Sequence, residues 1–120
     1  MIVGSVKEVK EFENRVGLMP AHAAEYVKAG HEVFVEAGLG LGSGFTDEEY
    51  SEAGAKVLDN AKDVWEKSKM IIKVKEPLAQ EYDLMQNEQI IFTYFHLAKD
   101  EDLAKVMLEK HISAMAYETV

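Results

Sequence analysis

A histidine that follows an apolar run is the side chain in this sequence best suited to proton transfer. Residues 90–98 read Ile-Ile-Phe-Thr-Tyr-Phe-His-Leu-Ala, and their β-branched and aromatic side chains predict a buried strand over Ile90–Tyr94. Open α/β sheets bind ligands at the carboxyl ends of their strands. Because imidazole titrates near neutral pH, we predict that His96, two residues beyond this strand, is a general acid/base. Tyr94 either packs in the core or lines the same site with its hydroxyl on a ligand.

Two cations, Arg15 and Lys75, also follow predicted strands. Lys75 comes directly after the apolar run Met70–Val74, and Arg15 lies in a polar loop after the first strand. A guanidinium group binds a carboxylate through two hydrogen bonds, and an ammonium group donates to the same oxygens. Each could instead be a surface cation that extends to water. Lys75 lies at the end of a strand, which favours a role in the site. Lys73 would lie further from the crevice.

Strand-like and helix-like segments alternate along the chain. The predicted strands are Ile2–Val6, His31–Ala37, Ala55–Leu58, Met70–Val74, Ile90–Tyr94 and Ile112–Ala116. The predicted helices are Ala21–Ala29 after Pro20, one from the capping box of Thr46 and Glu49 to Ala53, Ala61–Lys67, Leu78–Met85, and Asp100–Lys110 capped by Asp100. This order predicts an α/β fold, a flavodoxin/Rossmann-like, mostly parallel sheet with helices on both faces. Because no helix follows the last strand, we expect the fold to be incomplete at its C-terminal end.

The glycine-rich stretch Gly38–Gly44 invites comparison with a dinucleotide-binding loop, but its spacing does not match. The third glycine of that fingerprint would fall at Ser43 or Phe45, and the loop follows the second strand instead of the first. We therefore predict a structural turn. The remaining histidines, His22, His31 and His111, are interpreted as structural.

Composition narrows the classes of function. The net charge of −9 argues against nucleic acid as a partner, because phosphate binding needs lysine and arginine. No apolar run is long enough to span a bilayer, so no membrane partner is expected. The chain has no cysteine and no His-x-x-x-His spacing, which predicts a cytoplasmic protein without disulfides or a metal site.

Short motifs across nearly the whole chain match one known protein family. They are Lys7-Glu8, Glu13-Asn14-Arg15-Val16, Leu18-Met19-Pro20, Gly30-His31-Glu32-Val33, Glu36-Ala37-Gly38, Gly44-Phe45-Thr46-Asp47, Tyr50, Ala53-Gly54-Ala55, Lys73-Val74-Lys75-Glu76-Pro77 and Tyr94-Phe95-His96-Leu97-Ala98. In these motifs the chain resembles the N-terminal portion of bacterial L-alanine dehydrogenases, which are related to the nicotinamide nucleotide transhydrogenase alpha chain. The last two motifs are the most specific, and the transhydrogenase chain lacks the final one, which favours the dehydrogenase.

The resemblance implies oxidative deamination of L-alanine to pyruvate and ammonia with NAD, and the reverse reaction. It implies that Arg15 clamps the substrate carboxylate and that Lys75 hydrogen-bonds both this carboxylate and the oxygen or nitrogen on the reacting carbon. It implies that His96 is the acid/base for addition and loss of water at the imine carbon, and that Tyr94 lines the pocket. Members of the family are homo-oligomers, typically hexamers.

The family's full chains continue into an NAD-binding Rossmann domain and then complete the substrate domain. The resemblance thus implies that residues 1–120 are a portion of the substrate domain and that NAD is bound mainly by residues outside them. We expect residues 1–120 to lack dehydrogenase activity alone, and to self-associate through an exposed apolar patch.

Two positions depart from the family pattern. Val6 stands where the family usually has proline, and Met19 stands where a threonine usually precedes Pro20. The second change removes a helix cap worth about 1 kcal/mol. Two alternatives stay open beside the dehydrogenase: a fragment similar to the transhydrogenase alpha chain, and a stand-alone module that binds a small carboxylate or a partner.

Overall fold

Six parallel strands form one sheet at the centre of the protein. The computed structural model describes residues 1–9, 15–75, 77–94 and 101–116. The strands are β1 (Ile2–Ser5), β2 (Glu32–Glu36), β3 (Lys56–Leu58), β4 (Met70–Lys75), β5 (Ile90–Tyr94) and β6 (Ser113–Ala116). They lie in the order β3-β2-β1-β4-β5-β6, and every neighbouring pair is parallel. This arrangement confirms the predicted α/β class, and each predicted strand is present within two residues of its predicted ends.

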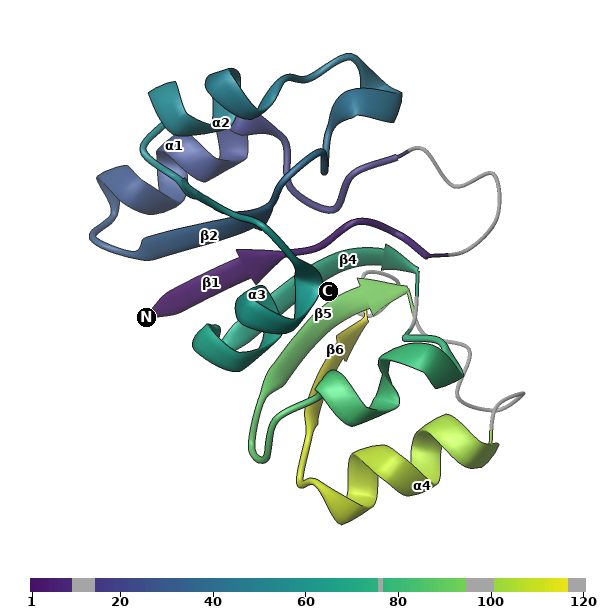
Figure 1. The fold of residues 1–120 in the computed structure, drawn as a ribbon. Coiled ribbons are helices and arrows are strands. Elements are labelled where there is room, and N and C mark those ends of the chain that lie inside the picture. The colour runs from purple at the N-terminus through teal and green to yellow at the C-terminus, as the bar shows by residue number, and fades with distance from the viewer. Residues whose placement is uncertain (10–14, 76, 95–100, 117–120) are drawn as a thin grey trace.

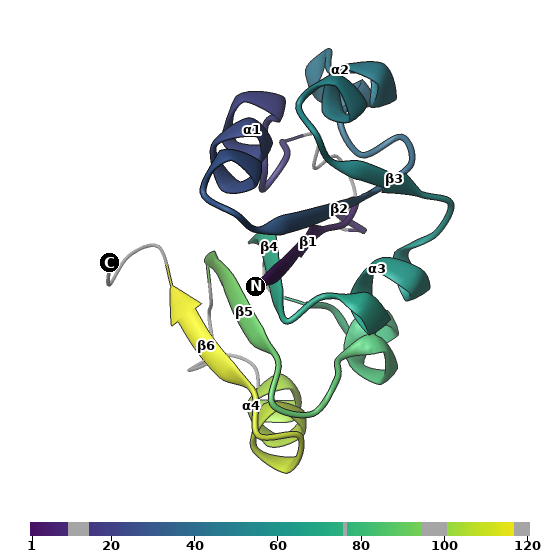
Figure 2. The same ribbon diagram turned by 90° about the vertical axis from the view of Figure 1, so that its left-hand side faces the viewer.

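Helices cover both faces of the sheet, as predicted. The α-helices are α1 (Pro20–Lys28), α2 (Asp47–Glu52), α3 (Ala61–Lys67) and α4 (Glu101–Glu109), and two 3₁₀ helices are η1 (Leu41–Ser43) and η2 (Ala79–Leu84). Figure 2 shows α1 and α2 on one side of the sheet and α3 and α4 on the other (see also Figure 1). The helix predicted over Leu78–Met85 is the 3₁₀ helix η2, and the predicted cap Asp100 lies outside the described residues.

Alternation along the strands divides the apolar side chains into two cores. Val33 and Val35 of β2 pack with Tyr50 and Leu18 on the α1–α2 side. Phe34, between them in sequence, points to the other core. Successive side chains of a strand point to opposite faces, so one short apolar run supplies both layers. The remaining large contributors on the α3–α4 side are Val6, Val64, Trp65, Ile71, Met85, Ile91, Leu103 and Met107.

The helix starts follow the local sequence. Thr46 and Glu49 form the predicted capping box at the start of α2, since each side chain bonds the other residue's backbone N–H. Pro20 is the first residue of α1, where its missing N–H would have no partner anyway. Met19 precedes it and makes no side-chain cap, as expected from the departure at this position.

The strand order reverses direction between β1 and β4. After β1 the chain crosses through α1 to β2 on one side, and after β3 it returns through α3 to β4 on the other side of β1. In open α/β sheets, ligands bind beyond the carboxyl ends of the strands at this switch point. The edge formed by the ends of β1 and β4 is therefore the place to look for a site. In the described ranges, no helix has the length and apolar character to cross a bilayer.

Candidate functional site

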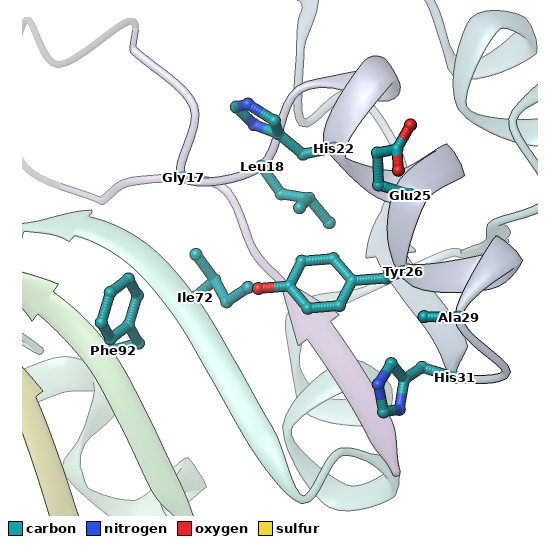
Figure 3. Close-up of a pocket in the computed structure, with 9 residues that line it drawn as sticks. All are labelled: Gly17, Leu18, His22, Glu25, Tyr26, Ala29, His31, Ile72 and Phe92. Atoms are coloured by element: carbon teal, nitrogen blue, oxygen red, sulfur yellow. The ribbon is translucent and has the colours of Figure 1, made fainter.

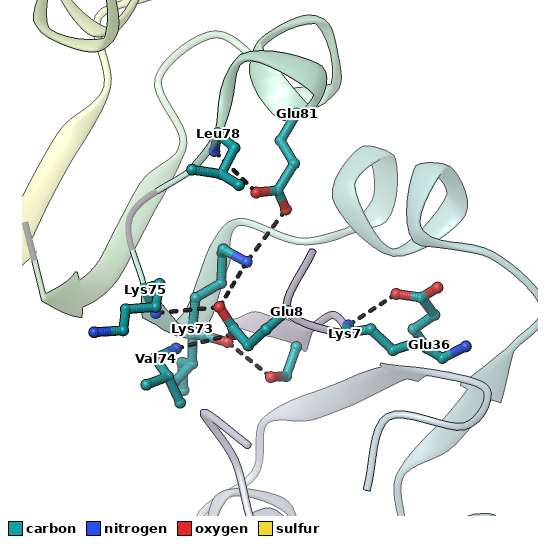
Figure 4. A network of polar contacts seen from close by, with 10 residues as sticks. Lys7, Glu8, Glu36, Lys73, Val74, Lys75, Leu78 and Glu81 are labelled. Atoms are coloured by element: carbon teal, nitrogen blue, oxygen red, sulfur yellow. Dashed lines mark hydrogen bonds and ion pairs between the residues drawn. The ribbon is translucent and has the colours of Figure 1, made fainter. Parts of the chain in front are cut away.

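The carboxylate of Glu8 holds the end of β4. Its side chain is only 2% exposed and accepts hydrogen bonds from the backbone N–H groups of Val74 (3.0 Å) and Lys75 (3.1 Å). The ammonium of Lys73 lies 3.2 Å from the same carboxylate. Figure 4 shows these contacts converging on one side chain. Because Glu8 follows β1, it joins the two central strands just beyond the last residues that they pair, Ser5 and Ile72.

Lys73 is a buried cation between two carboxylates. Its side chain is 1% exposed, and its Nζ lies 3.2 Å from Glu81 Oε2 as well as from Glu8. Glu81 belongs to η2 and also accepts the N–H of Leu78 at 3.1 Å. Burial raises the pKa of the Glu81 carboxyl, while Lys73 and the Leu78 N–H oppose that rise. A buried charge without partners is strongly destabilising, so these two acids are what allow a lysine inside β4.

The loop that carries Arg15 is anchored from two directions. Gly17 lies so close to β4 that a Cβ at this position would come within 2.7 Å of the carbonyl oxygen of Ile72. The hydroxyl of Tyr50 donates a 2.7 Å hydrogen bond to the carbonyl of Leu18. Burial raises the pKa of Tyr50 to about 12, and neighbouring acids add to the rise, so the hydroxyl keeps its proton at neutral pH. These contacts hold Gly17 against β4 and Leu18 against α2, two and three residues after Arg15.

Arg15 borders a small hollow at this edge of the sheet. The hollow has a volume of about 310 Å³ and is lined by Lys7, Glu8, Arg15, Gly38, Leu39, Leu41 and Gly42. The glycine-rich loop forms one wall. Gly38 and Gly44 have φ values of +81° and +85°, and the N–H of Gly38 donates to Asp47 at 2.8 Å. Such features are typical of a structural turn, as predicted, although the sequence did not indicate that the turn borders a hollow.

Three of the four predicted site residues lie at this one edge. Lys75 ends β4 and pairs with Tyr94, the last residue of β5. Arg15 borders the hollow, and Glu8 connects it to Lys75. His96 lies outside the described residues, so its predicted place in the site stays a prediction. Among the described residues, no group of three or more acidic or histidine side chains could hold a metal ion.

The α/β fold agrees with the family comparison. The model of the alanine dehydrogenase/PNT N-terminal domain matches residues 4–120. The chain belongs to this family. Over its whole length it is 52% identical to an alanine dehydrogenase of Methanococcus maripaludis and 47% identical to one of Bacillus subtilis.

Solved structures of the alanine dehydrogenase/PNT family have the same fold. An L-alanine dehydrogenase matches 98% of this chain with a TM-score of 0.95 and 48% identity. A transhydrogenase from Sinorhizobium meliloti matches 98% of it with a TM-score of 0.91 and 31% identity. The chain spans about a third of the length of these relatives, 32% of each alanine dehydrogenase and 35% of the transhydrogenase.

A second hollow in this family member lies between α1 and the strands β4 and β5. It has a volume of about 480 Å³, and Leu18, Tyr26, Ile72 and Phe92 give it apolar walls. Figure 3 shows Tyr26 reaching from α1 toward Ile72. His22 and His31 line the same hollow, and His31 packs edge-on against Tyr26 with its Nδ1 3.2 Å from the N-terminal amine. These contacts fit the structural role expected for His31, and the same role for His22 stays a prediction.

Sequence reasoning missed three residues that build the edge: Glu8, Gly17 and Lys73. Glu8 appeared only within a family motif, and Lys73 only as a less convenient alternative to Lys75. The available signal for Glu8 was an acid soon after the first strand together with a lysine inside an apolar run. A buried lysine requires a carboxylate, but the sequence could not say which of the 22 acidic residues supplies it.

Proposed function

We propose that the chain is the substrate-binding part of an NAD-dependent alanine dehydrogenase, which converts L-alanine, NAD and water to pyruvate, ammonia and NADH. The observation that carries the proposal is that Lys75 and Tyr94 end β4 and β5 and that Arg15 borders a hollow with Glu8, which binds the N–H of Lys75. The identity of about half to alanine dehydrogenases over the whole chain supports this activity over others that the same fold could host.

Each residue has a role that its chemistry allows. Arg15 would bind the substrate carboxylate with two parallel hydrogen bonds, which fixes the orientation of the small substrate. Lys75 would donate to the same carboxylate and to the oxygen or nitrogen on the reacting carbon. His96 would give and take the proton as water adds to and leaves the imine carbon, and Tyr94 would form part of the wall.

The described residues do not fit the pyrophosphate of NAD. A dinucleotide site needs free backbone N–H groups at a helix N-terminus after the first strand. Here the glycine loop follows β2, leads into the three-residue helix η1, and uses the N–H of Gly38 on Asp47. We therefore propose that NAD is held by residues other than these, and that residues 1–120 alone do not oxidise alanine. NADH formation with alanine and saturating NAD tests this, and turnover above background would contradict it.

Binding of pyruvate tests the substrate role directly. Calorimetry on the protein and on Arg15→Ala should show that the substitution weakens pyruvate binding by at least about 10-fold, because a charge-assisted bidentate contact is lost. Lys28→Ala removes an exposed cation at the end of α1 and should leave the affinity unchanged. Equal binding by wild type and Arg15→Ala would rule out the clamp.

The transhydrogenase likeness supports a second candidate, a domain of that related chain, because 31% identity extends over 98% of the residues. The two candidates differ in their need for alanine. Under the first, His96→Gln and Lys75→Gln in the protein as its gene encodes it strongly lower alanine-dependent NADH formation. Under the second, nucleotide-to-nucleotide hydride exchange proceeds without alanine and survives both substitutions.

We also propose that the protein forms homo-oligomers, and the apolar hollow at α1, β4 and β5 supports this. Light scattering on residues 1–120 should give a mass above the 13.5 kDa of one such chain. A monodisperse monomer would contradict the proposal. The cytoplasmic location expected from the absence of cysteine stays a prediction.

A further inference from the structure

We infer that Glu8 is a positioning residue that fixes the backbone of β4 so that Lys75 faces the substrate. The inference rests on the proposed role of Lys75. It adds Glu8, which does not contact the substrate itself, to the residues on which substrate binding depends. It is carried by the hydrogen bonds that Glu8 accepts and by the irregularity of β4 at the same place.

The two N–H groups that Glu8 binds are consecutive along the chain. In a regular strand, successive N–H groups point to opposite neighbours, so a single acceptor cannot bind both. The pairing of β4 with β5 shifts register between Ile72 and Lys75, which marks a local bulge. The bulge turns the N–H groups of Val74 and Lys75 toward the same carboxylate. Bulges beside active sites re-aim a side chain, and here the re-aimed side chain is Lys75.

The side chain of Glu8 accepts hydrogen bonds from β4 beyond the point where β1 and β4 stop pairing. The pairing of β1 with β4 ends at Ser5 and Ile72, and the hydroxyl of Ser5 donates to the carbonyl of Ile72 at 2.7 Å. Beyond this point β1 supplies no acceptor to β4, and the carboxylate of Glu8 takes over that function. Without it, two partly buried donors at the end of β4 would lose their partners.

Lys73 neutralises Glu8 and holds it in place. Its ammonium lies 3.2 Å from Glu8 and 3.2 Å from Glu81, on the η2 side of the sheet. The side chain of Lys75 extends away from this cluster in Figure 4, although its backbone N–H belongs to it. Glu8 thus binds the main chain of Lys75 and forms its ion pair with Lys73, so the side chain of Lys75 can face a substrate carboxylate.

Hydrogen exchange tests the structural half of the inference without any substrate. In Glu8→Gln one carboxylate oxygen becomes an NH₂ donor, so Val74 and Lys75 cannot both keep their acceptor. Exchange of these two amides should accelerate about 10-fold or more, while that of Ile71 in the same strand should not change. Glu36→Gln is the matched control, because Glu36 accepts the N–H of Lys7 at 2.8 Å on the β2 side. Unchanged exchange at Val74 and Lys75 in Glu8→Gln would overturn the inference.

A double-mutant cycle tests the functional half in the protein as its gene encodes it. Glu8→Gln should raise the KM for pyruvate about 10- to 100-fold, the range for a misplaced binding group, with the KM for NADH unchanged. Combined with Lys75→Gln, it should add nothing further, because both act through Lys75. Additive effects, or a fall in kcat with both KM values unchanged, would show a merely structural Glu8. If Lys75→Gln alone has no effect, the proposed function fails, whereas the exchange result still stands.

Should Glu8→Gln not fold, Glu8→Asp serves in both experiments. It keeps the negative charge beside Lys73 but shortens the side chain by one methylene group, so the carboxylate withdraws from the two N–H groups. The same acceleration at Val74 and Lys75 and the same KM change are expected. Wild-type behaviour of Glu8→Asp in both would overturn the inference.

Discussion

The two hollows of this protein are both lined in part by the loop before α1, yet they differ in chemistry. The hollow at the strand ends is bordered by Lys7, Glu8 and Arg15, and its supporting charges are paired through bonds that cross the sheet. The hollow beside α1 is larger and mainly apolar, with Tyr26, Ile72 and Phe92 in its walls. The difference teaches that volume is a poor guide to function here. Under the proposed function the charges of the smaller hollow would bind a small anion, whereas the larger one offers a packing surface.

The largest expected effect comes from removing the cation beneath the strand-end hollow. Lys73→Met keeps the length of the side chain but leaves Glu8 and Glu81 buried without their counter-charge. The free energy of unfolding should fall by about 3–5 kcal/mol, measured by urea denaturation at pH 7.

Lys56→Met provides the control for this comparison. Lys56 pairs with Glu32 at 3.0 Å, but the side chains are 65% and 45% exposed. Losing that pair should change stability by less than about 1 kcal/mol. If the two substitutions had equal effects, the burial of the Lys73 cluster would not matter energetically.

An intermediate effect is expected from Gly17→Ala, which acts on the wall between the two hollows. The added methyl group would approach backbone atoms of Ile72 and Lys73 at 2.7–2.8 Å, so the loop must move away from β4. We expect a loss of about 1–3 kcal/mol in stability, and weaker pyruvate binding because Arg15 moves with the loop.

Gly30→Ala is the control that introduces backbone strain without moving the loop that carries Arg15. Gly30 has φ of +94° and no atom within 4 Å of an added Cβ, so alanine there is strained without a clash. It should cost about 1 kcal/mol and leave pyruvate affinity unchanged. Equal pyruvate affinities for the wild type, Gly17→Ala and Gly30→Ala would mean that the Gly17 contact does not position Arg15.

A smaller effect is expected at the apolar hollow. Tyr26 is half-buried, and its ring packs against His31 at a centroid distance of 5.9 Å. Tyr26→Ser should lower stability by about 1 kcal/mol and reduce the fluorescence of a bound apolar dye, with no change in pyruvate affinity. A loss of pyruvate binding would show that the two hollows are functionally connected.

The smallest predicted effect is a change in the pH dependence of stability in Glu81→Gln. Burial raises the pKa of Glu81 in the folded protein above its unfolded value of 4.5. Its contribution to stability is therefore complete below pH 4.5 and is lost as pH rises through the folded-state pKa. Because glutamine does not ionise, the stability of the wild type relative to Glu81→Gln should fall over that range. A difference that stays constant, or grows in favour of the wild type, would contradict the prediction.

The sequence predicted the strands better than the site, and the reason is physical. Strands such as Ile90–Tyr94 are local apolar runs, so their ends could be read directly from residue types. The segment after β4 was harder, since Leu78–Met85 has helical composition but forms a 3₁₀ helix. Its Glu81 reaches inward to Lys73, a constraint absent from the local pattern.

For the site, strand-end position favoured Lys75, whereas the role of Arg15 came from the family resemblance. Lys75 ends β4 and Arg15 borders the strand-end hollow, and the roles of both stay predictions. Neither feature could identify Glu8, because its partners depend on which strands become neighbours. The same holds for Gly17, whose need for glycine comes from the backbone of β4 alone. Contacts between distant segments are a property of the topology, and composition does not record them.

The contacts of Glu8 with the end of β4 also affect the order in which the parts of this protein fold. Glu8 lies 65 positions from Lys73 and 67 from Lys75, with β2, β3 and three α-helices between them. Contacts with such separation form slowly, because a long loop must close before any of them contributes free energy. We expect the nearby β1–α1–β2 unit to assemble early and the Glu8 bonds to appear only when β4 docks beside β1. A nascent or partly unfolded chain would then contain much of its secondary structure but no competent substrate site, so binding would report on the completed fold alone.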